Sequence, residues 1–248
     1  MEAIYPDLRG RAALVTGASS GIGFGIAEAL LRQGMRVAGQ VRSGKAPAGC
    51  LEVRAELGTE EGCVAAARTA RAELGRVDVF VHSAGIWNAG PIGELRRETL
   101  EEMFRVNTFS AFTLVRELLP ALRPHGSIVF IGSTAGQRGE ARHAHYAASK
   151  GAIQSLVASL AVELAPEVRT NLVSPGWVRT KMAEATLERI GPVLLPTLPN
   201  QRVAEIADVV NAVLFLASDA SSHLLGQDMC VSGGALYVVP RGQLGVVR

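Results

Sequence analysis

The eight residues TGASSGIG, from Thr16 to Gly23, decide how this chain folds. They follow the apolar run AALV at positions 12–15, which predicts a buried strand, and they precede apolar residues at helical spacing. Glycines at 17, 21 and 23 permit a tight turn and the close approach of a pyrophosphate, which the N–H groups of the following helix can bind. The stretch therefore predicts a dinucleotide site. The alternative is a turn whose glycines only let the strand and the helix pack together.

Short apolar runs alternate with longer helical patterns along the rest of the chain. Strands are expected at 12–15, 37–41, 50–53, 77–81, 127–131, 170–173 and 228–231, and helices at 22–33 (closed by Gly34), 59–74, 98–122, 146–164 and 203–216. This alternation predicts an α/β fold: one Rossmann-like domain over residues 1–248, with a doubly wound parallel sheet of about seven strands and helices on both faces. The proline-containing segment 180–200 is expected to form a substrate loop.

The composition excludes several classes of protein. The formal net charge is only +2, from 25 basic and 23 acidic side chains, so no nucleic-acid surface is expected. No apolar run is long enough to span a membrane and no signal-peptide pattern opens the chain, so we expect a cytoplasmic protein without a membrane segment. Cys50, Cys63 and Cys230 lie far apart in the sequence, which fits neither a disulfide framework nor a metal site.

The segment VAGQVRSGK, at 37–45, indicates which dinucleotide is bound. NAD-binding folds place an acidic residue about 20 residues after the glycine turn, where it holds the ribose hydroxyls. This segment has no acid, but Arg42 and Lys45 could bind a 2′-phosphate, which an acid would repel. The sequence therefore predicts NADP(H). The alternative is that both cations are ordinary exposed side chains.

Tyr146 and Lys150, in the motif YAASK, carry the predicted chemistry together with Ser133. Residues at i and i+4 share a helix face. A tyrosine has an ordinary pKa of about 10, and a nearby ammonium lowers this pKa by favouring the phenolate. Ser133 follows a predicted strand and can donate a hydrogen bond to the same substrate carbonyl. A Tyr–Lys pair alone arises often by chance on helices, but with the serine and the glycine turn it predicts hydride transfer at a carbonyl.

The motifs resemble those of the short-chain dehydrogenase/reductase family over nearly the whole chain, and they are most similar to those of bacterial 3-oxoacyl-acyl-carrier-protein reductases. The matching pieces, in order, are TGASSGIG (16–23), HSAG (82–85), Asn107 in VNT, Ser133 in IGS, YAASK (146–150), SPG (174–176), FLASD (215–219) and VSGG (231–234). The order of so many motifs makes the resemblance specific. It implies an NADP(H)-dependent ketoreductase, with a role in fatty acid biosynthesis.

The resemblance also implies roles for single residues. Tyr146 would protonate the substrate oxygen, and Lys150 would lower the pKa of this tyrosine and hold the nicotinamide ribose. Ser133 would orient the carbonyl, and Asn107 would position a water in a proton relay. Glu56 stands where the family has an acid near the adenine. The implied cofactor contacts are Gly17, Ser19, Ser20, Gly21, Ile22, Gly23, Arg42, Glu56, Leu57, Ser83, Ala84, Gly85, Tyr146, Lys150, Pro175, Gly176, Val178 and Thr180.

Two departures from the family pattern bear on the site and its substrate. Ser83 stands where the family has asparagine, and its hydroxyl is expected to make a backbone-directed hydrogen bond that supports the turn less well. The carrier-protein reductases also carry an arginine where Ser127 follows Gly126 here, and a second arginine before the sixth strand, which the segment APEVRT (165–170) places differently. The second departure argues against a substrate held by a carrier protein.

Two histidines and two tryptophans lie beside the predicted site. His143 and His145 precede Tyr146, and a metal bound by this pair is conceivable. No motif places a third ligand, so we expect no metal site and favour a place in the pocket wall. Trp87 and Trp177 follow two of the turns, where they could either line a substrate pocket or simply pack.

These features together predict reduction of a ketone or 3-oxoacyl group to a secondary alcohol by hydride transfer from NADPH, with Tyr146 as proton donor. The expected partner is a small carbonyl compound, a class that includes acyl thioesters. Two alternatives stay open: oxidation of a secondary alcohol such as a steroid or polyol, and a non-catalytic dinucleotide-binding sensor or scaffold. A homotetramer is expected, paired through the helices at 98–122 and 146–164.

Overall fold

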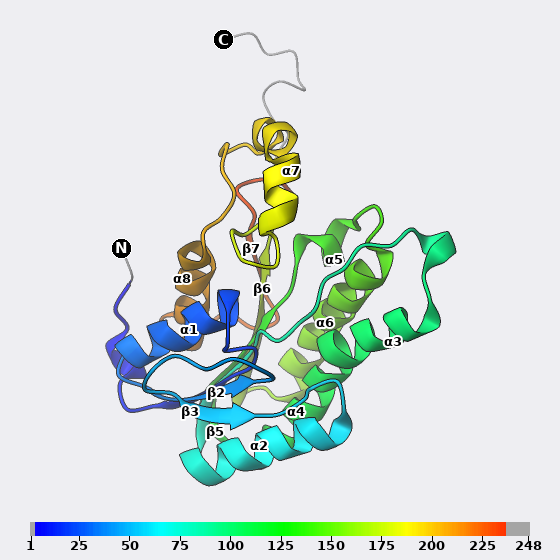
Figure 1. Cartoon of the computed structure of the whole chain (residues 1–248). Helices are drawn as coiled ribbons and strands as arrows, with labels where there is room; N and C mark the ends of the chain where they lie inside the picture. The colour runs from blue at the N-terminus through cyan, green and yellow to red at the C-terminus, as the bar shows by residue number, and fades with distance from the viewer. Residues whose placement is uncertain (1–2, 237–248) are drawn as a thin grey trace.

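Parallel strands form the centre of the computed structural model, which describes residues 3–236 (Figure 1). They are β1 (Ala12–Val15), β2 (Arg36–Val41), β3 (Leu51–Arg54), β4 (Val77–His82), β5 (Leu122–Ile131), β6 (Val168–Pro175) and β7 (Asp228–Val231). They form a 7-stranded sheet in the order β3-β2-β1-β4-β5-β6-β7, and each neighbouring pair is parallel. The predicted doubly wound sheet is therefore confirmed. Residues 1–2 and 237–248 of the expected domain lie outside the described residues.

Helices cover both faces of this sheet (Figure 1). One face carries α1 (Gly21–Arg32) and α8 (Ile206–Ala217), and the other carries α2 (Glu60–Leu74), α4 (Ser110–Leu118) and α6 (Ala144–Glu163). The other helices of the described residues are α3 (Arg97–Phe104), α5 (Thr134–Arg138) and α7 (Glu184–Leu194), with 3₁₀ turns at Pro6–Leu8, Ile92–Glu94, Leu119–Ala121, Leu195–Thr197 and Asp219–Ser221. The result is the three-layer arrangement that strand–helix alternation predicts.

Strand β1 shows how the sequence divides the core between the two faces. Ala12 and Leu14 pack with the helices α2, α4 and α6, whereas Ala13 and Val15 pack with α1 and α8. The alternation arises because successive side chains of a strand point to opposite faces of the sheet. All four side chains are fully buried, as parallel strands covered on both faces require.

The strand order places a site at one edge of the sheet. The connections from β1 run outward to β2 and β3, while those from β4 run the other way to β5, β6 and β7. In open α/β sheets, ligands bind outside the carboxyl ends of the strands where the direction reverses. The predicted turn follows the end of β1 at Val15, and Ser133 follows the end of β5 at Ile131.

The expected helix at 98–122 is present as a continuous helical stretch over residues 97–118, but it contains a π-helical turn and ends earlier than predicted. Helix α3 is followed by one π-helical turn (Arg105–Phe109) and then by α4, which ends at Leu118. Pro120 lies in the next 3₁₀ turn and has no N–H group with which to extend the helix. Strand β5 therefore begins at Leu122, earlier than the predicted residue 127.

The expected loop at 180–200 contains helix α7, which the sequence reasoning missed because of its prolines. Pro192 lies inside this helix. Leu187 of α7 packs with Leu198 and Val203 in a small apolar cluster, separate from the two main cores. In Figure 1, α7 rises beyond the edge of the sheet, so the segment still borders the expected site. The short helix α5 was also unexpected.

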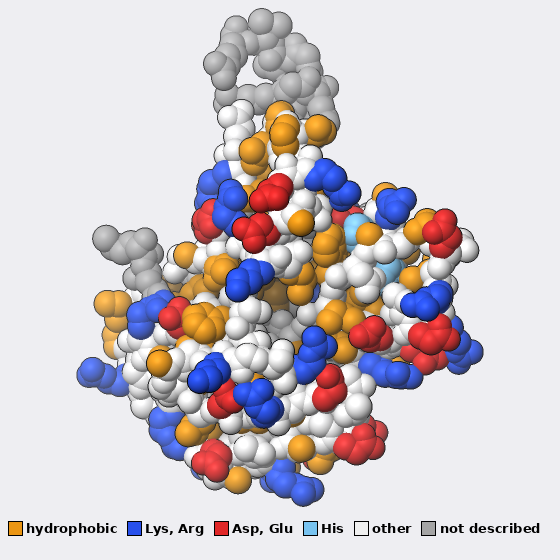
Figure 2. Space-filling view, in the orientation of Figure 1, with side chains coloured by type: hydrophobic (Ala, Val, Ile, Leu, Met, Phe, Trp, Pro, Cys, Tyr) orange, Lys and Arg blue, Asp and Glu red, His pale blue; other side chains and the backbone are white. Residues whose placement is uncertain are grey.

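The surface is mixed in charge on the face that Figure 2 shows, where basic and acidic side chains lie side by side. This mixture fits the small net charge of the sequence. Among residues 3–236, no helix combines the length and the apolar character needed to cross a membrane.

Candidate active site

A cavity of about 450 Å³ opens at the carboxyl ends of the strands, and Figure 2 shows the surface hollowed near the centre of the view. The cofactor half of its lining is the turn 17–23 without Ala18, followed by Gln40, Arg42, Ser43, Glu56 and Leu57. The substrate half is Trp87, Ser133, Thr134, Ala135, Arg138, Glu140, Tyr146, Trp177, Lys181, Met182 and Ala183. The rest of the lining is Ser83, Ala84, Gly85, Ile86, Val106, Ile131, Gly132, Lys150, Pro175, Gly176, Val178 and Thr180. One cavity thus joins the two predicted sites.

The backbone of the glycine turn lies so close to neighbouring backbone atoms that side chains at Gly17 and Gly23 would not fit. Gly17 has a φ of +68°, and a Cβ there would lie 2.9 Å from the Cα of Ala84. A Cβ at Gly23 would overlap the carbonyl oxygen of Gly17. Ser20 precedes α1 but makes no side-chain cap, so the positive end of this helix faces the cavity without a capping partner in the described chain. This cradle fits the pyrophosphate of a dinucleotide.

The turn after β4 is held by Thr16, which corrects the expectation for Ser83. The Oγ1 of Thr16 accepts hydrogen bonds from the backbone N–H groups of Ser83 and Ala84, both at 3.0 Å. The Ser83 hydroxyl itself makes no hydrogen bond within residues 3–236. The side chain of serine is shorter than that of asparagine, and Thr16, which follows the neighbouring strand β1, supports the turn instead.

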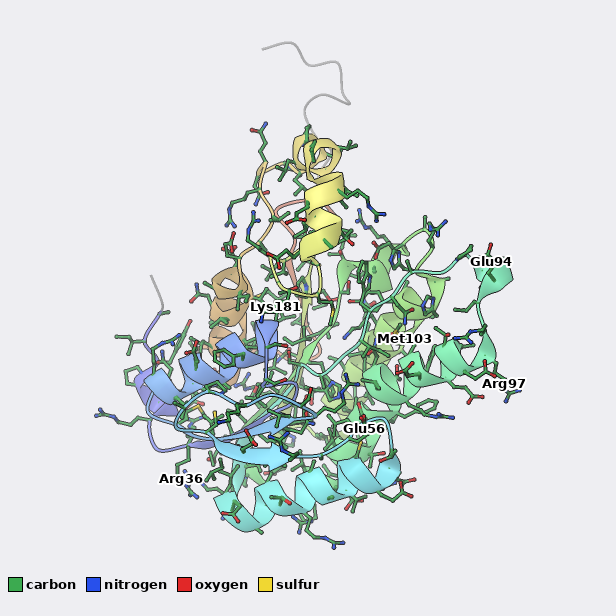
Figure 3. The ribbon with its side chains drawn as sticks, viewed as in Figure 1. Arg36, Glu56, Glu94, Arg97, Met103 and Lys181 are labelled. Atoms are coloured by element: carbon green, nitrogen blue, oxygen red, sulfur yellow. The ribbon has the colours of Figure 1, made fainter. Side chains whose placement is uncertain are left out.

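The far end of the cofactor half carries the expected positive charge. Arg42 lines the cavity, is exposed, and has no hydrogen bond or ion pair with the described residues, so its guanidinium is available to a phosphate. Lys45 does not line the cavity. Glu56, labelled in Figure 3, also lines it and accepts a hydrogen bond from the N–H of Gly58 at 2.8 Å. This set fits the adenosine part of NADP(H).

Gln40 is a cavity residue that the sequence reasoning missed. Its Oε1 accepts a hydrogen bond from the N–H of Gly17 at 3.0 Å, and its Nε2 donates one to the carbonyl of Ala55 at 2.8 Å. The side chain is buried. Gln40 therefore joins the phosphate turn to the wall that carries Glu56. A polar residue in an otherwise apolar strand was the available signal.

Ser133 and Tyr146 lie together at the start of the substrate half. Ser133 begins α5, and its Oγ accepts a hydrogen bond from the N–H of Ala135 at 3.1 Å. Burial raises the pKa of Tyr146, a hydrogen bond with Ser133 lowers it, and the charge of Glu140 raises it again. The net pKa lies above the ordinary value because the loss of hydration has the largest effect.

Lys150 is buried beneath Tyr146. Its Nζ donates a hydrogen bond to the carbonyl of Ile131 at 2.9 Å and lies 6.0 Å from the centre of the Tyr146 ring. Burial lowers the pKa of Lys150 to about 8. The pKa of Tyr146 lies above its ordinary value even with this ammonium nearby, because burial has the largest effect on it.

Asn107 lies behind the cavity rather than in its lining. It occupies the π-helical turn, and its amide exchanges hydrogen bonds with the backbone of Ile86 at 2.7 and 3.0 Å. Its Nδ2 also lies 3.0 Å from the sulfur of Met103, labelled in Figure 3, and 3.1 Å from the hydroxyl of Ser149. The π turn thus aims Asn107 at the strand-end turn, as such bulges often do at functional sites.

The structure brings together almost all the predicted residues. Every expected cofactor contact lines the cavity, as do Ser133, Tyr146 and Lys150, and Asn107 is the exception. A Cβ at Gly85 would lie 3.3 Å from the Oδ1 of Asn107 and 3.5 Å from the Nζ of Lys150, so Asn107 stands directly behind the lining. Arg138, Glu140 and Met182 were missed because the short helix α5 and the loops that hold Glu140 and Met182 give no periodic signal.

The two tryptophans both line the cavity and pack on each other. The Trp87 ring stacks on His143 at 4.8 Å between centroids and meets the edge of Trp177 at 6.0 Å. His145 is buried and hydrogen-bonded to Asn88. No group of three metal-ligating side chains occurs within residues 3–236. His143 therefore supports an aromatic pocket wall.

The positions that resemble docking sites for a carrier protein face inward. Ser127 is buried, and its hydroxyl donates a hydrogen bond to the carbonyl of Leu216 at 2.8 Å. The guanidinium of Arg169 donates to the carbonyls of Leu216, Ser218 and Ser221, at the end of α8. Neither residue offers a positive charge to an acidic partner.

Comparisons with known proteins agree with this geometry. The family model described as Enoyl-(Acyl carrier protein) reductase matches residues 17–235. The 3-oxoacyl-[acyl-carrier-protein] reductase FabG of Escherichia coli (strain K12) is 32% identical over 244 residues, which cover 94% of this chain and 100% of FabG.

Solved structures share the fold. A Brucella melitensis protein described as Short-chain dehydrogenase/reductase SDR:Glucose/ribitol dehydrogenase has a TM-score of 0.90 at 30% identity, and the match covers 95% of this chain and 100% of that one. A Beutenbergia cavernae structure described as an NAD(P) dependent gluconate 5-dehydrogenase, with bound NADP at low occupancy, has a TM-score of 0.86 at 35% identity, covering 94% and 99%. The chain therefore belongs to the short-chain dehydrogenase/reductase family, as its motifs predicted. It is an oxidoreductase of a family whose members use NADP(H).

Proposed function

We propose that the protein reduces a ketone to a secondary alcohol with NADPH. The observation that carries this proposal is that one cavity holds both sites, because the glycine turn, Ser133, Tyr146 and Lys150 all line it. A sensor or scaffold would need the turn but not the three polar residues. Reduction and oxidation use the same groups, and a ketoreductase among the relatives favours reduction.

The residues of the chain divide the chemistry between them. When bound, NADPH supplies the hydride that the carbonyl carbon accepts. Tyr146 donates its phenolic proton to the carbonyl oxygen, so that the products are a secondary alcohol and NADP⁺. Ser133 donates a hydrogen bond to the same oxygen, which strengthens as negative charge develops there. Lys150, beneath the ring, is a positive charge that favours the phenolate left behind.

Asn107 and the raised pKa of Tyr146 fit this direction of reaction. A tyrosine whose pKa lies above its ordinary value carries its proton at neutral pH and is available as a donor, although the same rise makes release of the proton harder. Asn107 holds the strand-end turn through Ile86 and so keeps the space above Lys150 in shape. We assign Asn107 to this positioning role, and a water held for the proton relay is part of the same proposal.

The preference for NADPH over NADH rests on Arg42. Its side chain is unpaired with the described residues and reaches the cavity at the end of β2, where an acid would select NADH. An arginine can bind a 2′-phosphate through two parallel hydrogen bonds.

We also propose that the substrate is a free ketone rather than a group carried by a protein. Ser127, where the carrier-protein reductases have an arginine, and Arg169, in the segment that places the second arginine differently, are both directed into the fold. An acyl thioester that is not attached to a carrier protein stays among the proposed carbonyl substrates, but the hydrogen bonds of Ser127 and Arg169 do not favour it over a ketone. The protein is further proposed to assemble as a homotetramer.

Replacement of Tyr146 by phenylalanine tests the proposed function. Consumption of NADPH is measured with a panel of ketones for the wild type and for Tyr146→Phe, and NADPH binding is measured by fluorescence titration. The variant should lose nearly all turnover while binding NADPH nearly as well, because the proton is needed only as charge develops. A Tyr146→Phe enzyme that keeps most of its rate would overturn the assignment.

A further inference from the structure

The substrate half carries charged side chains that the protein itself does not neutralise. Arg138 ends helix α5, Glu140 follows two residues later, and Lys181 lies just before α7; Lys181 is labelled in Figure 3. Within residues 3–236, neither Arg138 nor Lys181 makes a side-chain hydrogen bond or ion pair. A binding pocket for a purely apolar ketone would have no use for these groups, since each costs hydration when the pocket closes on a ligand.

Glu140 is the most informative of these residues. Its side chain is only 25% exposed, and its one ion-pair contact in the described chain is a long one, 3.8 Å from Oε1 to the Nδ1 of His143. That Nδ1 already lies 2.9 Å from the carbonyl of Ala141. The carboxylate therefore keeps its capacity to accept hydrogen bonds while lying in the cavity wall.

The position of Glu140 has a cost for the reaction. Its charge raises the pKa of Tyr146, so it disfavours the phenolate that proton donation leaves behind. A carboxylate that only supported the loop could stand farther from the reacting group. Its place in the wall indicates a second use there, which is contact with the substrate.

The mixture of charges identifies the kind of substrate group. A carboxylate accepts hydrogen bonds and a guanidinium only donates them, so one pocket offers both kinds of partner. A cationic substrate would be attracted by Glu140 but repelled by Arg138 and Lys181. An anionic substrate would be attracted by the two cations but repelled by Glu140. A hydroxyl both donates and accepts, so neighbouring hydroxyls on one molecule use Glu140 and Arg138 together.

The aromatic wall agrees with such a molecule. Trp87, supported by the stacked ring of His143, and Trp177 present two indoles at nearly right angles. They can cover the C–H faces of a short carbon chain while its hydroxyls reach the charged residues.

We propose that the substrate half selects a short polyhydroxylated ketone, whose hydroxyl groups bind to Glu140 and Arg138 beside Ser133 and Tyr146. This inference rests on the proposed reductase function and adds the substrate class to it. The step is unchanged: the carbonyl carbon gains a hydride, the carbonyl oxygen gains the Tyr146 proton, and NADPH becomes NADP⁺.

Matched pairs of substrates test the class. The two enantiomers of erythrulose are compared with 2-butanone, which has the same four carbons and carbonyl position but no hydroxyls. Xylulose is compared with 2-pentanone, and the N-acetylcysteamine thioester of acetoacetate represents acyl substrates. A site built to bind hydroxyls rejects the analogue without them, so kcat/KM should be at least about 100-fold higher for one hydroxylated ketone than for its partner.

Variants then connect this ratio to the named residues. Glu140→Gln and Arg138→Gln should each reduce the ratio of kcat/KM between the hydroxylated ketone and its partner by roughly tenfold to a hundredfold, as expected when a charged hydrogen bond is lost. Glu140→Gln should also move the fall of activity at high pH to a lower pH, since the charge that raises the pKa of Tyr146 is gone. Two variants serve as controls: Glu94→Gln, at the outer edge in Figure 3, and Arg68→Gln, at an exposed position of α2. Both should leave the ratio unchanged.

Binding without turnover separates failure of this inference from failure of the proposed function. The chain has 2 tryptophans and both line the cavity, so ligand binding can be followed by their fluorescence in the NADP⁺-loaded protein. Erythrulose or xylulose should change this signal at lower concentrations than the matched ketone. If no ketone is reduced, the proposed function is wrong, and the binding comparison still decides the substrate class. If 2-butanone, 2-pentanone or the thioester is reduced as well as the hydroxylated ketones, the substrate class is wrong and the reductase stands.

Discussion

The Nζ of Lys150 lies 6.0 Å from the centre of the Tyr146 ring but donates its hydrogen bond to the carbonyl of Ile131. The lysine is therefore anchored to the end of β5 and not to the tyrosine. Both residues are buried, and burial favours the neutral form of each side chain. It therefore raises the pKa of Tyr146 and lowers the pKa of Lys150 to about 8. A bound cofactor and substrate would therefore enter a site in which Tyr146 holds its proton at neutral pH, while Lys150 titrates close to it.

Stability should depend on pH through Lys150. Its pKa in the folded protein, about 8, lies below the value of 10.5 for an unburied lysine. Below pH 8 the folded state must bury a charge, whereas between pH 8 and about 10 the unfolded chain binds more protons, so stability rises with pH. Relative to Lys150→Met, the wild type should gain roughly 2–4 kcal/mol of unfolding free energy between pH 7 and pH 10. Urea denaturation of both proteins at the two pH values measures this difference, and equal changes would contradict it.

Gly23 should tolerate no side chain. A Cβ at this position would overlap the carbonyl oxygen of Gly17, which is part of the backbone and cannot turn away. Gly23→Ala should lower the unfolding free energy by about 1–3 kcal/mol and weaken NADPH binding, because the turn must open to admit the methyl group. Gly93→Ala is the control, since a Cβ there meets nothing within 4 Å. Denaturation and cofactor titration measure both effects, and a Gly23→Ala protein that matches this control would refute the tight-turn assignment.

Some parts of the fold and site could be predicted from the sequence because they depend on short-range geometry. The spacing of Tyr146 and Lys150 on one helix holds wherever the helix lies, and strand periodicity gave the sheet. The π turn within the helix expected at 98–122 was not predictable from apolar spacing, because such a turn changes the backbone and not the pattern of residues. Glu140 and Arg138 lie in a segment whose course depends on long-range packing, and periodicity says nothing about it. The anchoring of Lys150 by Ile131 depends likewise on how β5 and α6 meet.

NADPH should bind more tightly than NADH, and Arg42 should account for the difference. Arg42→Asp places a carboxylate where the 2′-phosphate is expected, and NADPH binding should weaken by roughly tenfold to a hundredfold through loss of a charge-assisted contact. NADH binding should change little or improve, since an acid can hold the ribose hydroxyls. Lys45→Asp is a matched control outside the cavity lining. Isothermal titration of the two cofactors measures the effect, and equal affinities in the wild type would end the argument.

The protein should form a homotetramer in which α4 and α6 lie at a subunit interface. These helices cover one face of the sheet, yet their outer sides carry apolar side chains: Phe112 is 52% exposed and Val162 is 82% exposed. A helix with apolar residues on more than one face needs cover on both sides, and a second copy of the chain is the cover that a symmetric assembly supplies. Val162→Lys should therefore shift the assembly toward dimers or monomers. Val193→Lys, an equally exposed position on α7 at 75%, should leave the assembly intact. Light scattering at micromolar concentration measures the mass of each protein, and a wild type at 26.1 kDa would show that no such interface forms.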